Sequence, residues 1–330
     1  MKNSNNSDKS EKKDYQKDPG TFLSTRKAFG EALLDLGEKI PNLVVATANL
    51  AESTQVSLFA QKFPNRFVEV GVAEQNLAGV GAGLALSGKI PVITSFAVFS
   101  PGRNWDQIRI SICYNNANVK IVSTHAGLSP SKDGATHESL EDLALTRVLP
   151  NLTIFSPCDY YETKKVLAEA VQMQGPVYIR LGREETPVIT SPHSKFALGE
   201  IKVLEEGKRV ALVGTGTILA WGLPAAQRIN QKYKNSVKVI NCPTIKPLNE
   251  KQLLDELQGI NKVVTLEEHQ ISAGFGSEIA EIISEKDPKK IFRLGVKDSF
   301  GESGSYRMLL KKYKLDEESI ERTLLRVLKE

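Results

Sequence analysis

Phe67-Val-Glu-Val-Gly-Val-Ala-Glu-Gln-Asn76 is the segment on which the interpretation of this chain depends. Its first residues are typical of a short apolar strand, and Gly71 indicates a turn. A helix from Glu74 to Ser87 follows, so rich in Gly and Ala that we expect another backbone to pack closely on it. Glu74 thus stands where a strand gives way to a helix. It can be a poorly solvated acid that exchanges a proton, or an ordinary first-turn acid stabilised by the helix dipole.

The rest of the chain alternates β-rich runs with helical periodicity, which predicts mostly parallel α/β sheets. Strands are predicted at 44–48, 67–71, 92–95, 119–124, 152–155, 177–180, 210–213, 237–240, 262–265 and 291–294. Further helices are predicted at 29–40, 160–172, 218–231, 277–285 and 316–329. The pattern breaks into Pro, Ser and Thr around residues 184–200. We therefore expect an α/β protein with two domains, 21–185 and 200–330, each a mostly parallel sheet flanked by helices and joined by a linker over 186–199.

Composition narrows the class of protein. The 330 residues are 41% hydrophobic and 25% charged, as in soluble globular proteins, and are enough for two cores. The net charge of +4 is small and dispersed, which argues against nucleic acid or an acidic membrane as a partner. Residues 1–20 are almost entirely polar, which predicts a disordered tail and no signal peptide. The sequence contains no run of about 18 apolar residues, the length that would predict a membrane span.

The three cysteines, Cys113, Cys158 and Cys242, lie far apart. Their odd number argues against a disulfide framework, and their spacing is not that of metal ligands. The chain therefore fits a reducing cytoplasm, and we expect it to contribute no metal ligand of its own.

Side chains with chemical potential follow the predicted strands. Because ligands bind outside the carboxyl ends of strands in an open α/β sheet, we expect a site at this edge. The segment Thr124–His137 holds two of the four histidines together with two glycines and a proline, and a loop this long is more often functional than connective. The residues at this edge are Asn49, Glu74, Phe96, Phe99, His125, Asp133, His137 and Arg183.

The order of these motifs resembles the pyrimidine-binding half of transketolase. Glu74 lies in Gly-Val-Ala-Glu-Gln, Ser95-Phe-Ala-Val-Phe99 follows, and His125 precedes Asp133 by eight positions and His137 by twelve. Each motif is weak alone, but their common order and spacing are specific. The resemblance runs from about residue 21 to the C-terminus.

The second half of the chain carries further motifs of this family: Leu266-Glu-Glu-His269, Gly274-Phe-Gly276 and Asp298-Ser-Phe-Gly-Glu-Ser-Gly304. A complete transketolase also has an N-terminal domain that binds the cofactor's diphosphate through Mg²⁺, with a Gly-Asp-Gly motif. The single Asp-Gly of this chain, Asp133-Gly134, lies in the histidine loop instead. The chain therefore resembles the C-terminal subunit of a split transketolase. The resemblance implies that an N-terminal subunit brings the Mg²⁺ ligands, and we expect an α2β2 heterotetramer.

The resemblance implies the cofactor contacts. Glu74 would hydrogen-bond N1′ of the aminopyrimidine of thiamine diphosphate and so run the proton relay. Phe99 would stack on the pyrimidine with Phe96 behind it, although core packing is the alternative for both. Asn49 would contact the cofactor where transketolases usually have Asp, so a negative charge is missing there. Gly102 or a neighbour replaces a Tyr that flanks the pyrimidine in full-length enzymes.

The substrate contacts are also implied by the resemblance. The catalytic histidines would be His125, which helps to hold the sugar phosphate, and His137, which contacts hydroxyls near the reacting carbons. Asp133 would bind the C2 hydroxyl of the acceptor. Either histidine alone would more often be a loop or core residue with satisfied partners than a catalyst. Their shared loop favours a common site.

The resemblance also implies that Arg26, Ser53 and Arg183 form the binding site for the substrate's phosphate group. Guanidinium suits this task because its planar fork makes paired bonds to phosphate oxygens. Arg180 competes with Arg183 for the role, because the alignment could slip between them. A solvated surface charge is the alternative for each arginine.

The expected activity is thiamine diphosphate-dependent transfer of a two-carbon ketol unit from a ketose phosphate to an aldose phosphate, as in the pentose phosphate pathway. The alternatives are a reaction like that of 1-deoxyxylulose-5-phosphate synthase, ketol transfer with another sugar phosphate, and a non-catalytic subunit that stabilises its partner. Gly214-Thr-Gly216 is too short for a nucleotide-binding fingerprint. We interpret it as a tight turn in a structural domain that supports dimerisation.

Overall fold

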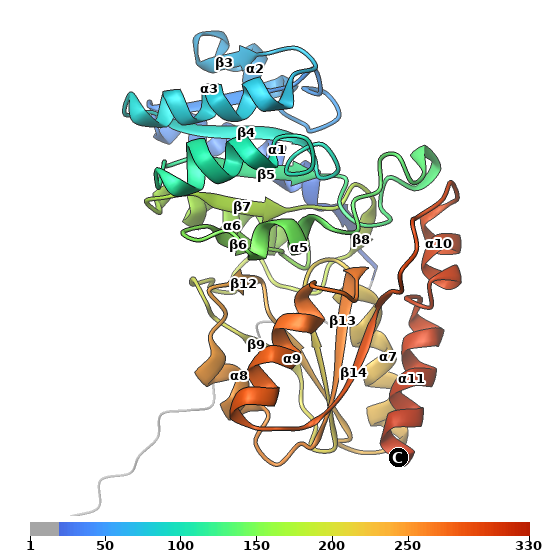
Figure 1. The fold of residues 1–330 in the computed structure, drawn as a ribbon. Coiled ribbons are helices and arrows are strands. Elements are labelled where there is room, and N and C mark those ends of the chain that lie inside the picture. Colours follow the sequence, from blue (N-terminus) through green and yellow to red (C-terminus); the bar gives the residue numbers. More distant parts are fainter. Residues whose placement is uncertain (1–19) are drawn as a thin grey trace, which may run out of the picture.

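The computed structural model describes residues 20–330 (Figure 1). The predicted disordered tail, except for Gly20, lies outside the described residues. Figure 1 shows two α/β units, one blue to green and the other yellow to red. Within residues 20–330, no helix combines the length and apolar character that a membrane span requires.

The first unit is built on a seven-stranded sheet in the order β12-β6-β7-β5-β4-β2-β3. Six of its strands are parallel: β2 (Leu43–Thr47), β3 (Phe67–Glu69), β4 (Ile90–Phe96), β5 (Lys120–Thr124), β6 (Thr153–Phe155) and β7 (Val177–Arg180). Every residue of β2, β5 and β7 is buried, as expected for parallel strands covered on both faces.

Helices cover both faces of this sheet. On one face, α1 (Thr25–Lys39), α2 (Ser57–Lys62) and α6 (Tyr160–Gln172) share a core that includes Phe29 and Val166. On the other face lie α3 (Glu74–Leu86), α4 (Trp105–Gln107), the π-helical turn η2 (Ile108–Tyr114) and α5 (Asp142–Arg147). Two 3₁₀ turns, η1 (Pro64–Arg66) and η3 (Ser131–Asp133), complete this unit.

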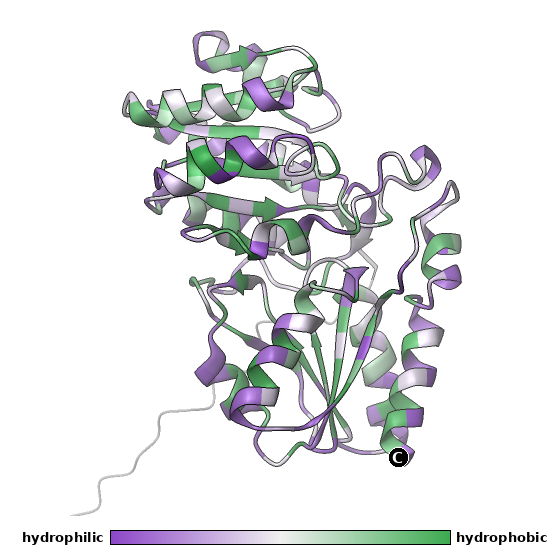
Figure 2. Cartoon of the chain, in the orientation of Figure 1, coloured by the Kyte–Doolittle hydropathy of each residue, from purple (hydrophilic) through white to green (hydrophobic). Residues whose placement is uncertain are grey.

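The second unit is built on a five-stranded sheet in the order β14-β13-β10-β11-β9. Its strands are β9 (Lys202–Glu205), β10 (Val210–Gly214), β11 (Val237–Asn241), β13 (Lys262–Gln270) and β14 (Lys290–Val296). Four of them are parallel, and β9 pairs antiparallel with β11. Its helices are α7 (Leu219–Lys232), α8 (Glu250–Glu256), α9 (Phe275–Lys286), α10 (Tyr306–Lys312) and α11 (Glu317–Lys329). Figure 2 shows apolar strands between helices with one polar face, so the predicted α/β fold class is confirmed.

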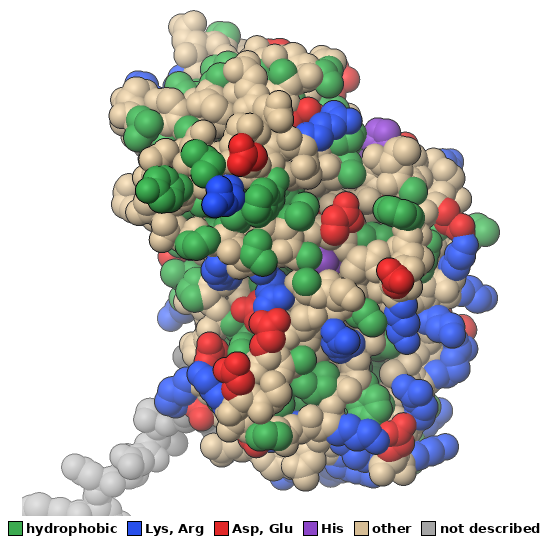
Figure 3. Space-filling view, viewed as in Figure 1, with side chains coloured by type: hydrophobic (Ala, Val, Ile, Leu, Met, Phe, Trp, Pro, Cys, Tyr) green, Lys and Arg blue, Asp and Glu red, His purple; other side chains and the backbone are tan. Residues whose placement is uncertain are grey.

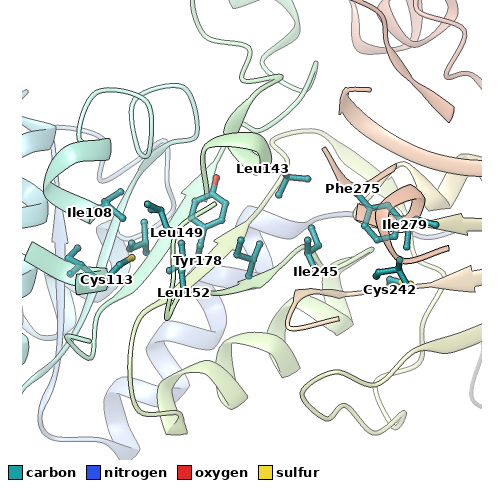
Figure 4. Close-up of a cluster of buried hydrophobic side chains, with 14 of the residues drawn as sticks. Ile108, Cys113, Leu143, Leu149, Leu152, Tyr178, Cys242, Ile245, Phe275 and Ile279 are labelled. Atoms are coloured by element: carbon teal, nitrogen blue, oxygen red, sulfur yellow. The ribbon is translucent and has the colours of Figure 1, made fainter. Parts of the chain in front are cut away.

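The two units share more than a linker. Strand β12 (Thr244–Lys246) comes from the second half of the chain but pairs antiparallel with β6 at the edge of the first sheet. Apolar side chains from both halves, among them Tyr178, Ile245 and Phe275, form one continuous cluster (Figure 4). The hydrophobic pattern predicted two cores, whereas the structure joins them.

The segment predicted as a linker, 186–199, begins inside packed structure. Strand β8 (Glu185–Pro187) pairs antiparallel with β1 (Phe22–Ser24). Just beyond it, the backbone N–H groups of Ile189 and Thr190 donate to Oδ2 of the buried Asp159, at 2.8 and 2.5 Å. These polar anchors hold the start of the connection against the first unit.

Candidate functional site

Glu74 is the first residue of α3 and its side chain is only 4% exposed. The chain reaches it through Gly71, whose φ of +73° is in the left-handed region that favours glycine. Nη1 of Arg103 lies 3.3 Å from Oε2 and 3.5 Å from Oε1 of Glu74. The amide of Asn104 donates to the backbone carbonyl of Glu74 at 3.1 Å. Glu74 is therefore a buried carboxylate that faces a guanidinium.

An aromatic platform lies next to this carboxylate. Phe96, the last residue of β4, stacks on Phe99 with ring centroids 5.7 Å apart and an interplanar angle of 17°. Cζ of Arg103 lies over the Phe99 ring, 4.0 Å from its centroid. Phe99 and Glu74 thus share Arg103 as a common neighbour.

His125 follows β5 and stacks on Phe96 at a centroid distance of 3.7 Å. Its ring is 2% exposed, and Nδ1 is 2.8 Å from Oγ1 of Thr124. Burial, with smaller contributions from Arg26 and Arg183, lowers the pKa of His125 to about 3. The imidazole is therefore neutral near pH 7 and can exchange hydrogen bonds but not contribute a charge.

His137 completes the cluster from the far end of the same loop. Its ring meets Phe99 edge-on, with centroids 5.5 Å apart, and its Nδ1 is 2.9 Å from Oγ1 of Thr136. The ends of the neighbouring parallel strands β4 and β5 thus bring two phenylalanines and two histidines together. This is the clustering that the strand-end rule predicted.

The arginines meet beside this cluster. Nη1 of Arg26 donates to the backbone carbonyl of Ser53 at 2.9 Å. Nη1 of Arg183 is 2.9 Å from Oδ2 of Asp133 and also donates to the carbonyl of Pro130. Burial and then the positive charge of Arg183 lower the pKa of Arg26. Two guanidinium groups that repel each other in this way favour an anion between them.

Arg180, the competitor of Arg183, has a different environment. Its Nε donates to Oδ2 of the fully buried Asp142 at 2.7 Å, and its Nη2 donates to the carbonyl of Glu268 at 2.9 Å. The Arg180 side chain is 8% exposed, whereas that of Arg183 is 33% exposed. The structure therefore favours Arg183 as the arginine that a solute can reach.

The structure shows the local surroundings of Asn49 and Gly102, the two positions at which this sequence differs from the transketolase pattern. Asn49 follows β2 with a φ of +60°, and its backbone N–H donates to Oε1 of Glu69 at 2.7 Å. Its side chain is exposed at the same sheet edge as Glu74. At Gly102 an added Cβ would lie 2.1 Å from the carbonyl oxygen of Val98. This backbone therefore accepts glycine and excludes a tyrosine.

Sequence reasoning did not identify Arg103 or Glu138 as site residues. The backbone N–H of Arg103 donates to the carbonyl of Phe99, so the two residues are one helical turn apart. That i, i+4 spacing is a signal that could have found Arg103. Glu138 is adjacent to His137 in sequence, and burial followed by the charge of Glu268 raises its pKa to about 7.

The segment Asp298–Gly304 of the second unit lies over the histidine loop. The backbone N–H of Gly304 donates to the carbonyl of Ser131 at 3.3 Å, and a Cβ added at Gly134 would lie 2.5 Å from Oγ of Ser303. The described residues 20–330 contain no group of three or more His, Cys, Asp or Glu side chains arranged to hold a metal ion.

Comparisons with known proteins identify the family of both units. Residues 22–188 match the family model for the transketolase pyrimidine binding domain, and residues 199–320 match that for the transketolase C-terminal domain. A Methanocaldococcus jannaschii protein named as a transketolase C-terminal section is 41% identical over 313 residues, covering 94% of this chain and 98% of that protein.

Two further similarities concern proteins made of subunits. The 6-deoxy-6-sulfo-D-fructose transketolase subunit of a Clostridium species is 36% identical, with 90% of this chain and 92% of that subunit covered. A solved structure of a split-gene transketolase, described as an inactive β4 tetramer, is 41% identical with a TM-score of 0.84, and the match covers 94% of this chain and 99% of that chain. The chain therefore belongs to the transketolase family and corresponds to its pyrimidine-binding and C-terminal domains.

Proposed function

We propose that this chain is the catalytic C-terminal subunit of a two-chain, thiamine diphosphate-dependent transketolase. The reaction moves a two-carbon ketol unit from a ketose phosphate to an aldose phosphate. The observation that carries the proposal is the buried carboxylate of Glu74 beside Phe99, at the carboxyl edge of a parallel sheet. A buried acid next to an aromatic platform is suited to hold a flat heterocycle and a proton.

The residues present fit the aminopyrimidine of thiamine diphosphate. The guanidinium of Arg103, a planar group with N–H donors, already lies over Phe99 and against Glu74. The same two side chains would therefore hold the pyrimidine: Glu74 at N1′ and Phe99 at the ring face. When bound, thiamine diphosphate would supply the electron sink that ketol transfer needs.

The sugar phosphate would bind along the histidine loop. Arg26 and Arg183 would hold the phosphate with Ser53, and phosphate would relieve the repulsion between the two guanidinium groups. His125 is neutral, so it would hydrogen-bond a hydroxyl or phosphate oxygen without adding charge. His137 and Asp133 would contact hydroxyls near the reacting carbons, and Asp133 would have to share its carboxylate with Arg183.

The second chain would bring the diphosphate and Mg²⁺ ligands, in an α2β2 assembly. The docking face would include the outer side of α3, the helix that begins at Glu74, where Gly79 and Gly83 are exposed and Leu86 is 72% exposed. Figure 3 shows hydrophobic side chains spread over this face of the first unit, with a few charged side chains among them. The related split-gene structure is described as inactive in its β4 form, which supports a requirement for another chain.

Reconstitution tests this function. The chain is mixed with an N-terminal chain that carries Gly-Asp-Gly, and ketol transfer from xylulose 5-phosphate to ribose 5-phosphate is measured. We expect activity in the mixture and none in either chain alone. Glu74→Ala should lower turnover by about 10²–10⁴-fold, the range for a positioned acid or base, without preventing assembly. Glu285→Ala, which removes an exposed acid on α9, is the control.

Three results would contradict the proposal. Full activity of this chain alone would exclude the two-chain arrangement. Unchanged turnover in the Glu74→Ala complex would favour a subunit that only stabilises its partner. Release of CO₂ from pyruvate would instead favour a reaction like that of 1-deoxyxylulose-5-phosphate synthase.

A second candidate is the same transfer with a sulfonated ketose as donor. It is favoured by the similarity to the subunit named for 6-deoxy-6-sulfo-D-fructose. A sulfonate presents oxygens that Arg26 and Arg183 can bind much as they would bind phosphate. Parallel assays of the reconstituted complex with 6-deoxy-6-sulfo-D-fructose and xylulose 5-phosphate separate the two candidates by kcat/KM.

A further inference from the structure

Arg103 makes, within this chain, the contacts that the proposed function assigns to the cofactor's aminopyrimidine. Its Nη1 lies 3.3 and 3.5 Å from the two carboxylate oxygens of Glu74, and its Cζ lies 4.0 Å from the Phe99 centroid. We propose that Arg103 is a latch that fills the pyrimidine slot in the unassembled chain and must swing out before the cofactor can bind. This inference rests on the proposed function.

The two occupants exclude each other because they use the same groups. A guanidinium and an aminopyrimidine are both planar and both pack on an aromatic face, and the guanidinium occupies the place at the Glu74 carboxylate where N1′ would lie. Phe99 already has Phe96 stacked on it and the edge of His137 against it, so its ring has few other surfaces to offer. The carboxylate of Glu74 is 4% exposed, and the half-exposed Arg103 guanidinium lies against it.

The latch also explains how Glu74 remains buried before the cofactor arrives. An ionised carboxylate that loses water without gaining a partner is strongly destabilising. Arg103 provides that partner in the free chain. When the aminopyrimidine replaces it, one proton taken up from solvent lies between the Glu74 carboxyl group and N1′, so the exchange leaves no unpaired buried group.

Several features show that Arg103 can leave. Its side chain is 53% exposed, so solvent is available to receive the guanidinium. Its distances to Glu74 are longer than the 2.7–2.9 Å typical of charge-assisted bonds, so the pair is loosely held. Arg180 is the contrast, because it is 8% exposed and bonded at 2.7 Å to a buried carboxylate.

A latch of this kind links cofactor loading to assembly. The apparent dissociation constant equals the intrinsic constant divided by the fraction of chains with an open slot. The free chain would therefore bind the pyrimidine poorly. Contacts to the diphosphate, supplied by the partner chain, would provide the additional binding free energy that moves Arg103 aside.

The test uses the full chain alone and measures binding rather than turnover. Thiamine diphosphate and 4-amino-5-hydroxymethyl-2-methylpyrimidine are titrated by calorimetry, with Trp105 fluorescence as a second signal two residues from the latch. We expect Arg103→Ala to bind both probes at least about tenfold more tightly than wild type, because the slot is open in every molecule. Arg103→Gln, which retains much of the side-chain length, should show a smaller gain. Arg109→Ala, an exposed arginine on η2, should match wild type.

The double variant Glu74→Ala/Arg103→Ala identifies the site of the gain. We expect it to lose the tightening, because the carboxylate that holds the pyrimidine is gone. Equal or weaker probe binding by Arg103→Ala, with an unchanged circular dichroism spectrum, would overturn the latch. So would the absence of measurable binding to that variant.

These failures differ from failure of the proposed function. If only the latch is wrong, the assembled wild-type complex still binds thiamine diphosphate and still loses turnover on Glu74→Ala. If the proposed function is wrong, the assembled complex shows neither cofactor binding nor dependence on Glu74.

Discussion

Glu138 combines deep burial with a position beside the histidine cluster. Its side chain is 4% exposed, and a Cβ added at Gly301 would overlap its Oε2, so the segment from the second unit presses against it. Burial, followed by the charge of Glu268, raises its pKa from 4.5 to about 7. The folded chain therefore holds this proton more tightly than the unfolded chain does.

The raised pKa of Glu138 has a definite effect on stability. Its favourable contribution is fully present below about pH 4.5 and is lost as the pH rises through about 7. The free energy of unfolding of wild type relative to Glu138→Gln should therefore fall between pH 5 and pH 8, by up to about 1.4 kcal/mol per pH unit. Urea denaturation at each pH measures this difference. Glu285→Gln is the control, and a Glu138→Gln difference that stays constant with pH would contradict the assignment.

Helix α3 presents two kinds of glycine. Gly79 and Gly83 are exposed, with nothing within 4 Å of an added Cβ. Gly81 is buried, and its added Cβ would lie 2.8 Å from Cγ2 of Ile93. Among the three glycines of α3, Gly81 alone packs within this chain in a way that needs the absence of a side chain. The glycine content of α3 predicts that another backbone packs closely on it. The outer face, where Gly79 and Gly83 lie, is the face still open to such packing.

Substitutions on α3 separate folding from assembly. Gly79→Ala should raise the free energy of unfolding by about 0.5–1 kcal/mol, because alanine loses less backbone entropy in a helix. Gly81→Ala should gain less or lose stability, because Ile93 must move. Urea denaturation checks both.

The larger variant Gly79→Leu tests the outer face of α3. It should leave the isolated chain folded but weaken assembly with the N-terminal chain, as measured by sedimentation velocity. Unchanged assembly would show that α3 does not lie at the interface.

The long helices and strands lie close to the positions that hydrophobic periodicity predicted for them. The amphipathic helix predicted at 160–172 is α6, with the same bounds, and the side chain of Asp159 accepts the N–H of Glu162 at its start. Short elements such as β12, α5 and α8 were missed. Three to seven residues contain too few periods to show a pattern, and β12 exists because β6 offers an unpaired edge.

The two units are joined by a buried polar network at the end of β13. Oε1 of Glu268 accepts the N–H of Leu128 at 2.7 Å, and its Oε2 accepts the hydroxyl of Tyr306 at 2.6 Å. Arg180 donates both to the backbone carbonyl of Glu268 and to the carboxylate of Asp142 in the first unit. The family motif Leu266-Glu-Glu-His269 therefore has a structural use: it clamps the second unit beneath the histidine loop.

Breaking this network should be far more damaging than removing a nearby exposed charge. Arg180→Ala leaves Asp142 buried without its cation, and we expect a loss of about 3–5 kcal/mol in the free energy of unfolding. Arg183→Ala removes a half-exposed pair and should cost about 0–1 kcal/mol. Denaturant unfolding compares the two, and similar losses would contradict the assignment of Arg180 to an internal pair.

The sequence was sufficient to predict the α/β class, most of the long strands and helices, and the gathering of Glu74, Phe99 and His125 at one edge. Each follows from local information: periodicity over ten or more residues, and the rule that parallel strands end on the same side. Tertiary structure alone placed Arg103 between Glu74 and Phe99, assigned Arg180 to an internal pair and joined the two cores through β12. These features depend on which distant groups become buried together, and burial sets the strength of a charge pair or the position of a pKa.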